Sequence, residues 1–300
     1  MNVQPGFEMG KKRVNGFLVA AGILIFTLIF VSGFGFWSAI HPQKISPTPI
    51  TPASLGLDFE NVQFVTSDKI PIRGWLVKSS SPQATRKVII VLHGYPANKT
   101  DVLSPLAFLA KRYDLLFFDF RYLGTSGGSY TSIGMKEVED LKSAVSFLQQ
   151  RKYRAIGIFG VSMGGATALM AAPDLPDVKA IVADSSYASL GLMTFQFYKE
   201  FSFLKYPLAF LTKLWAEAFF GKNVDKTSPM SAAKLLKIPI FIIHSRADTH
   251  IPFAQALLLK QSLENDPKAE FWFMDGREHG ETHLEKEFEP KVLGFFERYV

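Results

Sequence analysis

The N-terminal part of the chain carries a long apolar stretch. Between Arg13 and Lys44 there is no Asp, Glu, Lys or Arg, and residues 16–37 read GFLVAAGILIFTLIFVSGFGFW. As a helix these residues would span about 33 Å at ~1.5 Å per residue, enough for a hydrocarbon core of ~30 Å. The pattern predicts a transmembrane anchor over residues 16–37, preceded by a short tail over residues 1–15.

Two other interpretations of the apolar stretch are open. A core helix of a soluble domain would normally carry a polar stripe, which this stretch lacks. A cleaved signal peptide has an apolar region of about 7–15 residues, which is shorter than this one. Lys11, Lys12 and Arg13 precede the stretch, and Lys44 is the only nearby positive charge after it. Because positive charges stay on the cytoplasmic side, an anchor would leave the N-terminus cytoplasmic and the remainder extracytoplasmic.

A proline-rich segment follows the apolar stretch. Residues 38–54 contain prolines at positions 42, 47, 49 and 52. Proline fixes φ and lacks an N–H group, so the composition predicts a semi-rigid linker. We expect the folded domain over residues 55–300.

From Leu57 onward, short β-branched and aromatic runs alternate with longer helical patterns. The expected strands are Asp58–Val65, Ile70–Val77, Val88–Leu92, Leu115–Phe118, Ile156–Gly160, Ala180–Ala183, Ile238–His244 and Glu270–Met274. The clearest helical pattern is Met135–Arg151, with an apolar face. Runs such as VIIVL lack polar alternation, as expected where helices cover both faces of a sheet. The pattern predicts an α/β fold with a mostly parallel eight-stranded sheet, a leading antiparallel hairpin, and functional residues just after the strands.

Composition narrows the class of protein further. The 300 residues are 48% hydrophobic and 20% charged, which excludes a disordered chain. The absence of cysteine excludes disulfides, thiol nucleophiles and cysteine-based metal sites. The net charge of +6 is a mild excess for this length, so no nucleic-acid partner is expected.

One short motif carries a candidate nucleophile. The segment IFGVSMGGATALM reads as strand, tight turn and helix, and it contains the pattern G-x-S-x-G at Gly160, Ser162 and Gly164. Such a turn exposes the serine hydroxyl in a strained conformation, and small residues two before and two after let strand and helix approach. The pattern therefore predicts Ser162 as a nucleophile.

Residues 57–300 resemble the α/β-hydrolase superfamily, nearest to the single-domain serine esterases, lipases and peptidases. The resemblance rests on VLHGYPANKTD, FFDFRYLGTSGG, IFGVSMGGATA, IFIIHSRADTHIP and FMDGREHG, which occur in the order of the family. It implies the α/β-hydrolase fold, with a cap insertion at about residues 187–237.

A serine nucleophile needs a general base. His279 follows the last expected strand, where the family carries its catalytic histidine, and His283 is the alternative. The pair could also suggest zinc, but the zincin pattern needs Glu where Gly280 stands, so neither a metal nor another cofactor is expected.

The base in turn needs a carboxylate that orients it. Asp248 matches the family's position after a strand, and Asp184 and Asp119 are the alternatives. The oxyanion of acyl transfer needs N–H donors, which the resemblance assigns to the backbones of Met163 and Tyr95.

The expected cap is rich in aromatic residues. Ten of the 26 residues 195–220 are aromatic. They would form either an apolar wall over the serine, with Phe195, Phe201 and Trp215 contacting substrate, or a surface that touches the bilayer.

Together these features predict a membrane-anchored serine hydrolase that cleaves carboxylic esters or thioesters of lipophilic acyl groups through an acyl-enzyme. Its partners would be a small-molecule or lipid acyl-ester substrate and, through residues 16–37, a membrane. The alternatives are a serine peptidase or amidase with the same triad and a non-catalytic membrane-anchored binding protein.

Overall fold

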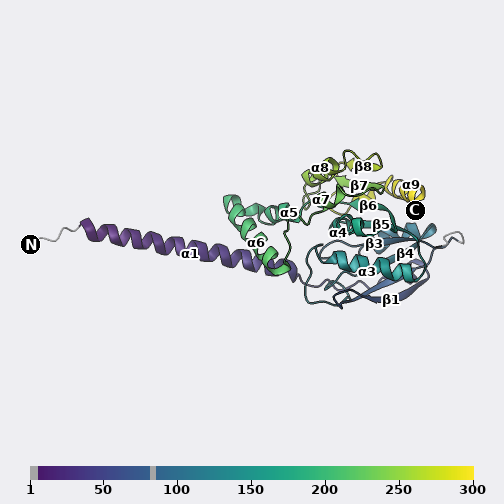
Figure 1. Ribbon diagram of the computed structural model, residues 1–300, viewed down its shortest axis with the longest axis horizontal. Coiled ribbons are helices and arrows are strands. Elements are labelled where there is room, and N and C mark those ends of the chain that lie inside the picture. The colour runs from purple at the N-terminus through teal and green to yellow at the C-terminus, as the bar shows by residue number, and fades with distance from the viewer. Residues whose placement is uncertain (1–5, 82–85) are drawn as a thin grey trace, which may run out of the picture. The chain divides into compact units, whose positions relative to one another are not determined.

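The computed structural model describes residues 6–81 and 86–300, with side chains from residue 16 onward (Figure 1). Of the tail predicted over residues 1–15, the first five residues lie outside the described part, and from Gly6 the backbone belongs to helix α1, Gly6–Ile40. The helix thus begins before the predicted span and ends three residues after it.

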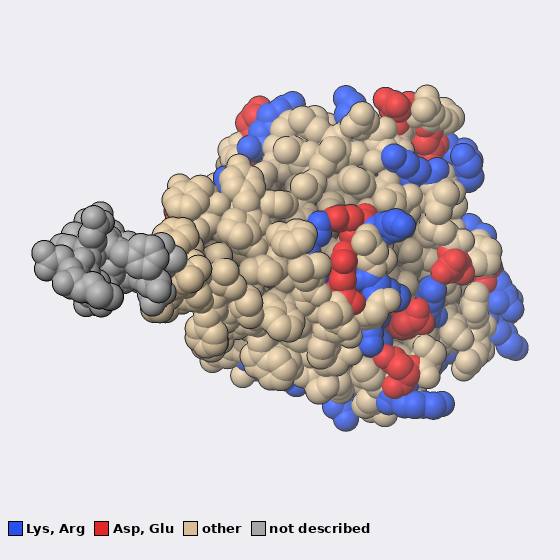
Figure 2. Space-filling view, turned by 60° about the vertical axis from the view of Figure 1, so that its left-hand side comes forward, with Lys and Arg blue, Asp and Glu red and all other residues tan. Residues whose placement is uncertain are grey.

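Within the described residues, one helix is long and apolar enough to cross a membrane. It is the part of α1 over Gly16–Ile40, where the mean hydropathy reaches 2.5 and only 6% of the most apolar window is buried. A core helix would be largely covered by protein, so this interpretation of the stretch does not hold. In Figure 2 a broad part of the surface, on the left, carries no charged side chain.

The contacts divide the chain into two compact units. The first combines α1 up to Ala39 with Thr194–Lys222, and the second combines Ile40–Met193 with Asn223–Val300. We call them the helical unit and the hydrolase unit. The predicted cap, residues 187–237, is therefore not one piece. Its helix α7, Pro229–Ala233, packs on α4 (Met163–Ala171) and α8 (Phe253–Ser262) of the hydrolase unit.

An eight-stranded sheet forms the centre of the hydrolase unit, counted over the described residues. Its strands are β1 Phe59–Val65, β2 Pro71–Val77, β3 Lys87–Leu92, β4 Asp114–Phe118, β5 Ala155–Val161, β6 Val178–Asp184, β7 Ile240–Ser245 and β8 Ala269–Met274. Their order is β1-β2-β4-β3-β5-β6-β7-β8. β1 and β2 form an antiparallel hairpin, β2 pairs antiparallel with β4, and all the other pairs are parallel. Both the mostly parallel sheet and its leading hairpin were predicted from the sequence and are confirmed.

Helices cover both faces of the sheet (Figure 1). The other α-helices within the described residues are α2 Leu103–Leu106, α3 Glu137–Gln150, α4 Met163–Ala171, α5 Leu190–Phe197, α6 Lys205–Phe220, α8 Phe253–Ser262 and α9 Phe288–Tyr299. Val88, Ile90 and Leu92 of β3 pack into the core with α3, α4 and α8, whereas Ile89 and Val91 pack into the core with α2 and α9. The two cores explain why this strand is apolar at every position.

The predicted linker lies along the hydrolase unit. The Tyr122 hydroxyl donates to the carbonyl of Pro42 (3.0 Å), and the Thr131 N–H donates to the carbonyl of Ile40 (3.0 Å). These hydrogen bonds hold its first residues against the loop that follows β4.

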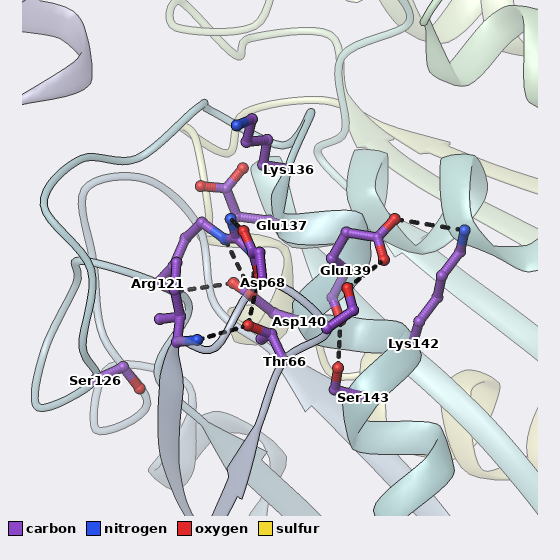
Figure 3. A network of polar contacts seen from close by, with 12 residues as sticks. Thr66, Asp68, Arg121, Ser126, Lys136, Glu137, Glu139, Asp140, Lys142 and Ser143 are labelled. Carbon is purple, nitrogen blue, oxygen red and sulfur yellow. Dashed lines mark hydrogen bonds and ion pairs between the residues drawn. The ribbon is translucent and has the colours of Figure 1, made fainter. Parts of the chain in front are cut away.

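Arg121 fixes the loop after β4 through a buried network of ion pairs (Figure 3). Its guanidinium donates to Asp140 of α3 (2.7 Å) and to Asp68 of the β1–β2 turn (2.7 Å), and its backbone N–H donates to Asp140 (2.9 Å). Burial alone would raise the pKa of Asp68, but hydrogen bonds from Arg121 and Thr66 and the charge of Arg121 lower it to about 2. One cation thereby joins three separate segments of the chain.

Candidate active site

Ser162 stands at the sharp turn between β5 and α4. Its φ of 54° and ψ of −116° lie outside the regions that residues other than glycine normally adopt. The turn is held because the N–H of Ser162 donates to the carbonyl of Asp184 (2.8 Å), while its own carbonyl accepts from Ala166 (3.1 Å). Such strain persists only where the surrounding structure imposes it, and it is typical of functional sites.

The two glycines of the motif are required by crowding around this turn. A Cβ atom at Gly160 would overlap the backbone of Gly164, and one at Gly164 would lie 2.7 Å from the carbonyl oxygen of Leu92. Strand β5, helix α4 and the end of β3 therefore meet with no room for a side chain at either position.

Asp248 and His279 come from the loops after β7 and β8, and a hydrogen bond joins them. Asp248 Oδ2 lies 2.7 Å from His279 Nδ1, and Asp248 Oδ1 accepts the N–H groups of His250 (2.9 Å) and Ile251 (2.8 Å). Burial alone would raise the pKa of Asp248, but the hydrogen bond and charge of His279 outweigh it, and the pKa lies below its usual value. An ionised carboxylate at Nδ1 keeps the proton there, which leaves Nε2 of His279 as the basic nitrogen.

The alternative residues make other contacts. The Nδ1 atom of His283 faces the carbonyl of Gly280 (2.9 Å). Asp119 pairs with Lys99 (2.6 Å). Asp184 accepts hydrogen bonds from the hydroxyls of Thr282 and Ser185, and burial raises its pKa to about 6 in spite of them. Of the three candidate carboxylates, all within the described residues, Asp248 alone is hydrogen bonded to a histidine side chain.

Ser162 and His279 line one cavity of about 200 Å³. Its walls also include Gly94, Tyr95, Asp184 and the alternative histidine His283, together with the apolar side chains of Val102, Leu106, Phe159, Val161 and Phe288. In the described part of the chain the hydroxyl and the imidazole share this cavity without a hydrogen bond between them; in unliganded enzymes this bond is often long. A larger open cavity of about 660 Å³ lies beside α7 and α8, and no histidine lines it.

His93 shapes the loop that carries Gly94 and Tyr95. It is fully buried, its Nε2 accepts the N–H of Phe120 (3.0 Å), and its Nδ1 donates to the carbonyl of Gly94 (2.7 Å). Burial lowers the pKa of His93, so the ring is neutral. A Cβ at Gly94 would lie 3.2 Å from the Cβ of Ser162, so this loop passes close beside Ser162.

The two residues expected to supply oxyanion donors flank the serine. Met163 is the first residue of α4, where a backbone N–H has no acceptor within its own helix. Tyr95 lines the cavity with Ser162. Their role as donors stays a prediction.

Sequence reasoning gave His244 no role. This buried histidine ends β7, and its Nε2 lies 2.9 Å from the carbonyl oxygen of Ile251 and 3.6 Å from Asp248 Oδ2. Burial lowers its pKa, so the neutral ring donates from Nε2 to Ile251 and braces the loop of Asp248. The signal in the sequence was a histidine at the end of a buried strand, four residues before the acid.

The three cap residues expected to contact substrate belong to the helical unit. Phe195 packs against the apolar cluster around Tyr198, and the ring of Phe201 meets the ring of Tyr198 edge-on. The indole N–H of Trp215 donates to the hydroxyl of Ser32 (3.3 Å). Their contact with substrate stays a prediction.

Known proteins with similar sequence and structure define the family. Residues 87–203 match the family described by the alpha/beta hydrolase fold. The chain is 30% identical to the uncharacterised protein YqkD of Bacillus subtilis, over 71% of this chain and 70% of that protein. It is 28% identical to the esterase Pf2001 of Pyrococcus furiosus, whose structure covers 86% of this chain and 99% of its own with a TM-score of 0.71. It is also 35% identical to the thiohydrolase aneE of Aspergillus aculeatus, over 38% of this chain and 37% of that protein.

The chain belongs to the α/β-hydrolase family. Its eight-stranded sheet, the serine at the turn after β5 and its likeness to an esterase together support hydrolase activity.

Proposed function

We propose that the protein is a membrane-anchored serine hydrolase that cleaves esters or thioesters of lipophilic acyl groups, with Ser162, His279 and Asp248 as its triad. The observation that carries the proposal is the hydrogen bond between Asp248 and His279 beside the strained Ser162, with the serine and the imidazole on one cavity.

The reaction begins when Ser162 Oγ attacks the acyl carbonyl and Nε2 of His279 takes the hydroxyl proton. Asp248 stabilises the imidazolium that forms, and the backbone N–H groups of Met163 and Tyr95 stabilise the oxyanion. When the tetrahedral intermediate collapses, His279 returns the proton to the departing alcohol or thiol and an acyl-enzyme remains. A water molecule, deprotonated by the same nitrogen, then releases the acid and frees Ser162.

Two observations support a lipophilic acyl group. The cavity beside Ser162 is walled by Val102, Leu106, Phe159 and Phe288, side chains that suit a hydrocarbon chain. The apolar helix α1 would hold the enzyme at a membrane, where lipophilic esters accumulate. Lys11, Lys12 and Arg13, which precede the apolar span Gly16–Ile40, favour a cytoplasmic N-terminus and a hydrolase unit on the other side of the membrane.

A fluorophosphonate probe tests the nucleophile in the full-length protein. We expect the probe to label the wild type and Ser143→Ala, a matched control on α3, but not Ser162→Ala. Hydrolysis of p-nitrophenyl esters of increasing chain length should follow the same pattern and favour longer chains. Ester hydrolysis that survives in Ser162→Ala would overturn the proposal.

A further inference from the structure

The helical unit has a surface that the proposed reaction does not explain. Tyr198, Leu208 and Ala209 are buried in this unit and form an apolar cluster, against which Leu28 and Val31 of α1 are packed. α6 and the residues before it therefore pack directly on the apolar helix α1.

Polar contacts reinforce this packing. The hydroxyls of Tyr198 and Thr212 are hydrogen bonded (2.9 Å), and Thr212 also donates to the carbonyl of Ser32 (3.4 Å). Trp215 donates to the hydroxyl of the same serine (3.3 Å). Hydrogen bonds of this kind between helices are a common source of association in membranes.

Gly35 of α1 permits the close approach. A Cβ atom at Gly35 would overlap the hydroxyl of Tyr198, whereas one at Gly33 would make only an ordinary contact with the indole of Trp215. In a bilayer, apolar side chains gain no hydrophobic free energy by moving from lipid to protein. Helices there associate through small residues and close packing.

The position of the contact along α1 sets its depth. Ser32 is 16 residues after Gly16 and 8 residues before Ile40, the two ends of the candidate span. At ~1.5 Å per residue these separations are about 24 Å and 12 Å. If Gly16–Ile40 crosses the membrane, the contact with α6 lies below the membrane surface, in the half nearer to Ile40.

The outer face of α6 has the composition expected at that depth. Tyr206 (59% exposed), Phe210 (60%) and Leu214 (46%) follow one another at intervals of four residues, so they lie on one face of the helix. Lys213 and Glu217, which are three residues after Phe210 and Leu214, border this face at one edge. The 16 residues of α6 are too few to span a bilayer. These features suit a short helix that lies beside α1 within one half of the bilayer and does not span it.

We propose that α6 is embedded in the membrane beside α1, with the face of Tyr206, Phe210 and Leu214 covered by lipid acyl chains. This inference rests on the proposed membrane anchoring of α1 and adds a second, non-spanning contact with the bilayer. The uncharged area in Figure 2 agrees with such a contact. We assign lipid to this face because α6 adjoins a helix of which only 6% of the most apolar window is buried.

The absence of cysteine makes the test direct. Single cysteines are introduced in the full-length protein as Phe210→Cys and Leu214→Cys on α6, Phe26→Cys in α1, and Glu264→Cys on the hydrolase unit as the water-exposed control. Each variant is placed in phosphatidylcholine nanodiscs, which leave both membrane faces accessible, and its reaction with a charged maleimide is timed. Labelling in sodium dodecyl sulfate confirms that all four thiols are intact.

We expect the cysteines at positions 26, 210 and 214 to react at least about tenfold more slowly than the one at 264. An apolar medium raises the pKa of a thiol, and each unit of increase removes about nine tenths of the reactive thiolate. Bimane probes at 210 and 214 should also be quenched by nitroxide-labelled lipids. Fast labelling at 210 and 214 with protection at 26 would overturn the inference and leave the anchor intact. Protection at 210 and 214 without lipid quenching would also overturn the inference, because it would mean that protein, and not lipid, covers this face. Fast labelling at all four positions would refute the anchor itself.

Discussion

The Arg121 network and the Ser162 site both depend on loops that follow strands of the sheet. They differ in whether their polar groups are hydrogen bonded to one another or face a cavity. Arg121 donates to Asp140 and Asp68, and the three residues join three segments of the chain. At the other site Asp248 is saturated by His279 and two backbone N–H groups, while the serine hydroxyl and the imidazole face a cavity. Under the proposed function, the difference separates charge that stabilises the fold from charge that prepares Ser162 and His279 for reaction.

The largest effect is expected from Asp248→Asn. The amide lacks the charge that stabilises the imidazolium, and it does not hold the proton at Nδ1 of His279, so kcat should fall by about 10⁴-fold. The free energy of unfolding should change far less than kcat. Steady-state kinetics with an activated ester measure the first quantity and urea unfolding measures the second. Asp275→Asn, on an exposed carboxylate, is the control. A loss of less than tenfold would mean that Asp248 does not orient the base.

Arg121→Ala should have the opposite signature. It leaves Asp140 buried without a cation, which should lower the free energy of unfolding by about 3–5 kcal/mol. The kcat of the molecules that remain folded should be unchanged. Arg246→Ala is the matched control, because Arg246 and its partner Asp275 are largely exposed and such pairs contribute about 1 kcal/mol or less. Equal destabilisation by the two substitutions would erase the distinction between the sites.

A third prediction concerns the pH dependence of stability that arises from Asp184, a buried carboxylate that lines the cavity and has no cation bound to it. Its pKa in the folded protein, about 6, lies above the usual 3.8, so the folded state binds this proton more tightly than the unfolded state. The stability that the proton provides is fully present below about pH 4 and is lost as the pH rises through 6, by up to about 3 kcal/mol. Relative to wild type, Asp184→Asn should therefore become more stable between pH 4 and pH 7. Urea unfolding at pH 4, 5.5 and 7 measures the trend, and a pH-independent difference would contradict it.

The smallest effect is expected from His244→Gln. His244 touches the loop of Asp248 rather than the reacting atoms, so its replacement should shift the carboxylate and lower kcat by roughly tenfold with little change in KM. A pH–rate profile checks this role, because a displaced carboxylate should also move the apparent pKa of the base. If stability alone changes, His244 is merely a core residue.

The sheet was predictable because each strand is a short apolar run, and every predicted strand is present with ends that differ by at most two residues. The pairing of Asp248 with His279 was expected from resemblance, and the structure joins the two residues by a hydrogen bond. The support from His244 was not foreseen, because it depends on a loop that folds back over the end of β7. The division of residues 187–237 between two units was missed for the same reason, since packing on α4 and α8 is decided by contacts distant in sequence.

The packing of α6 on α1 has a consequence for biosynthesis. The two halves of the helical unit are separated by more than 150 residues. At roughly 5–20 residues per second, α1 has left the ribosome about 10–30 seconds before its partner helix is made. During that interval Gly33, Gly35 and Ser32 have no α6 to contact. A shortened protein that begins after α1 would carry the reverse defect, with the cluster of Tyr198, Leu208 and Ala209 deprived of its cover, and we expect it to form soluble aggregates on size-exclusion chromatography.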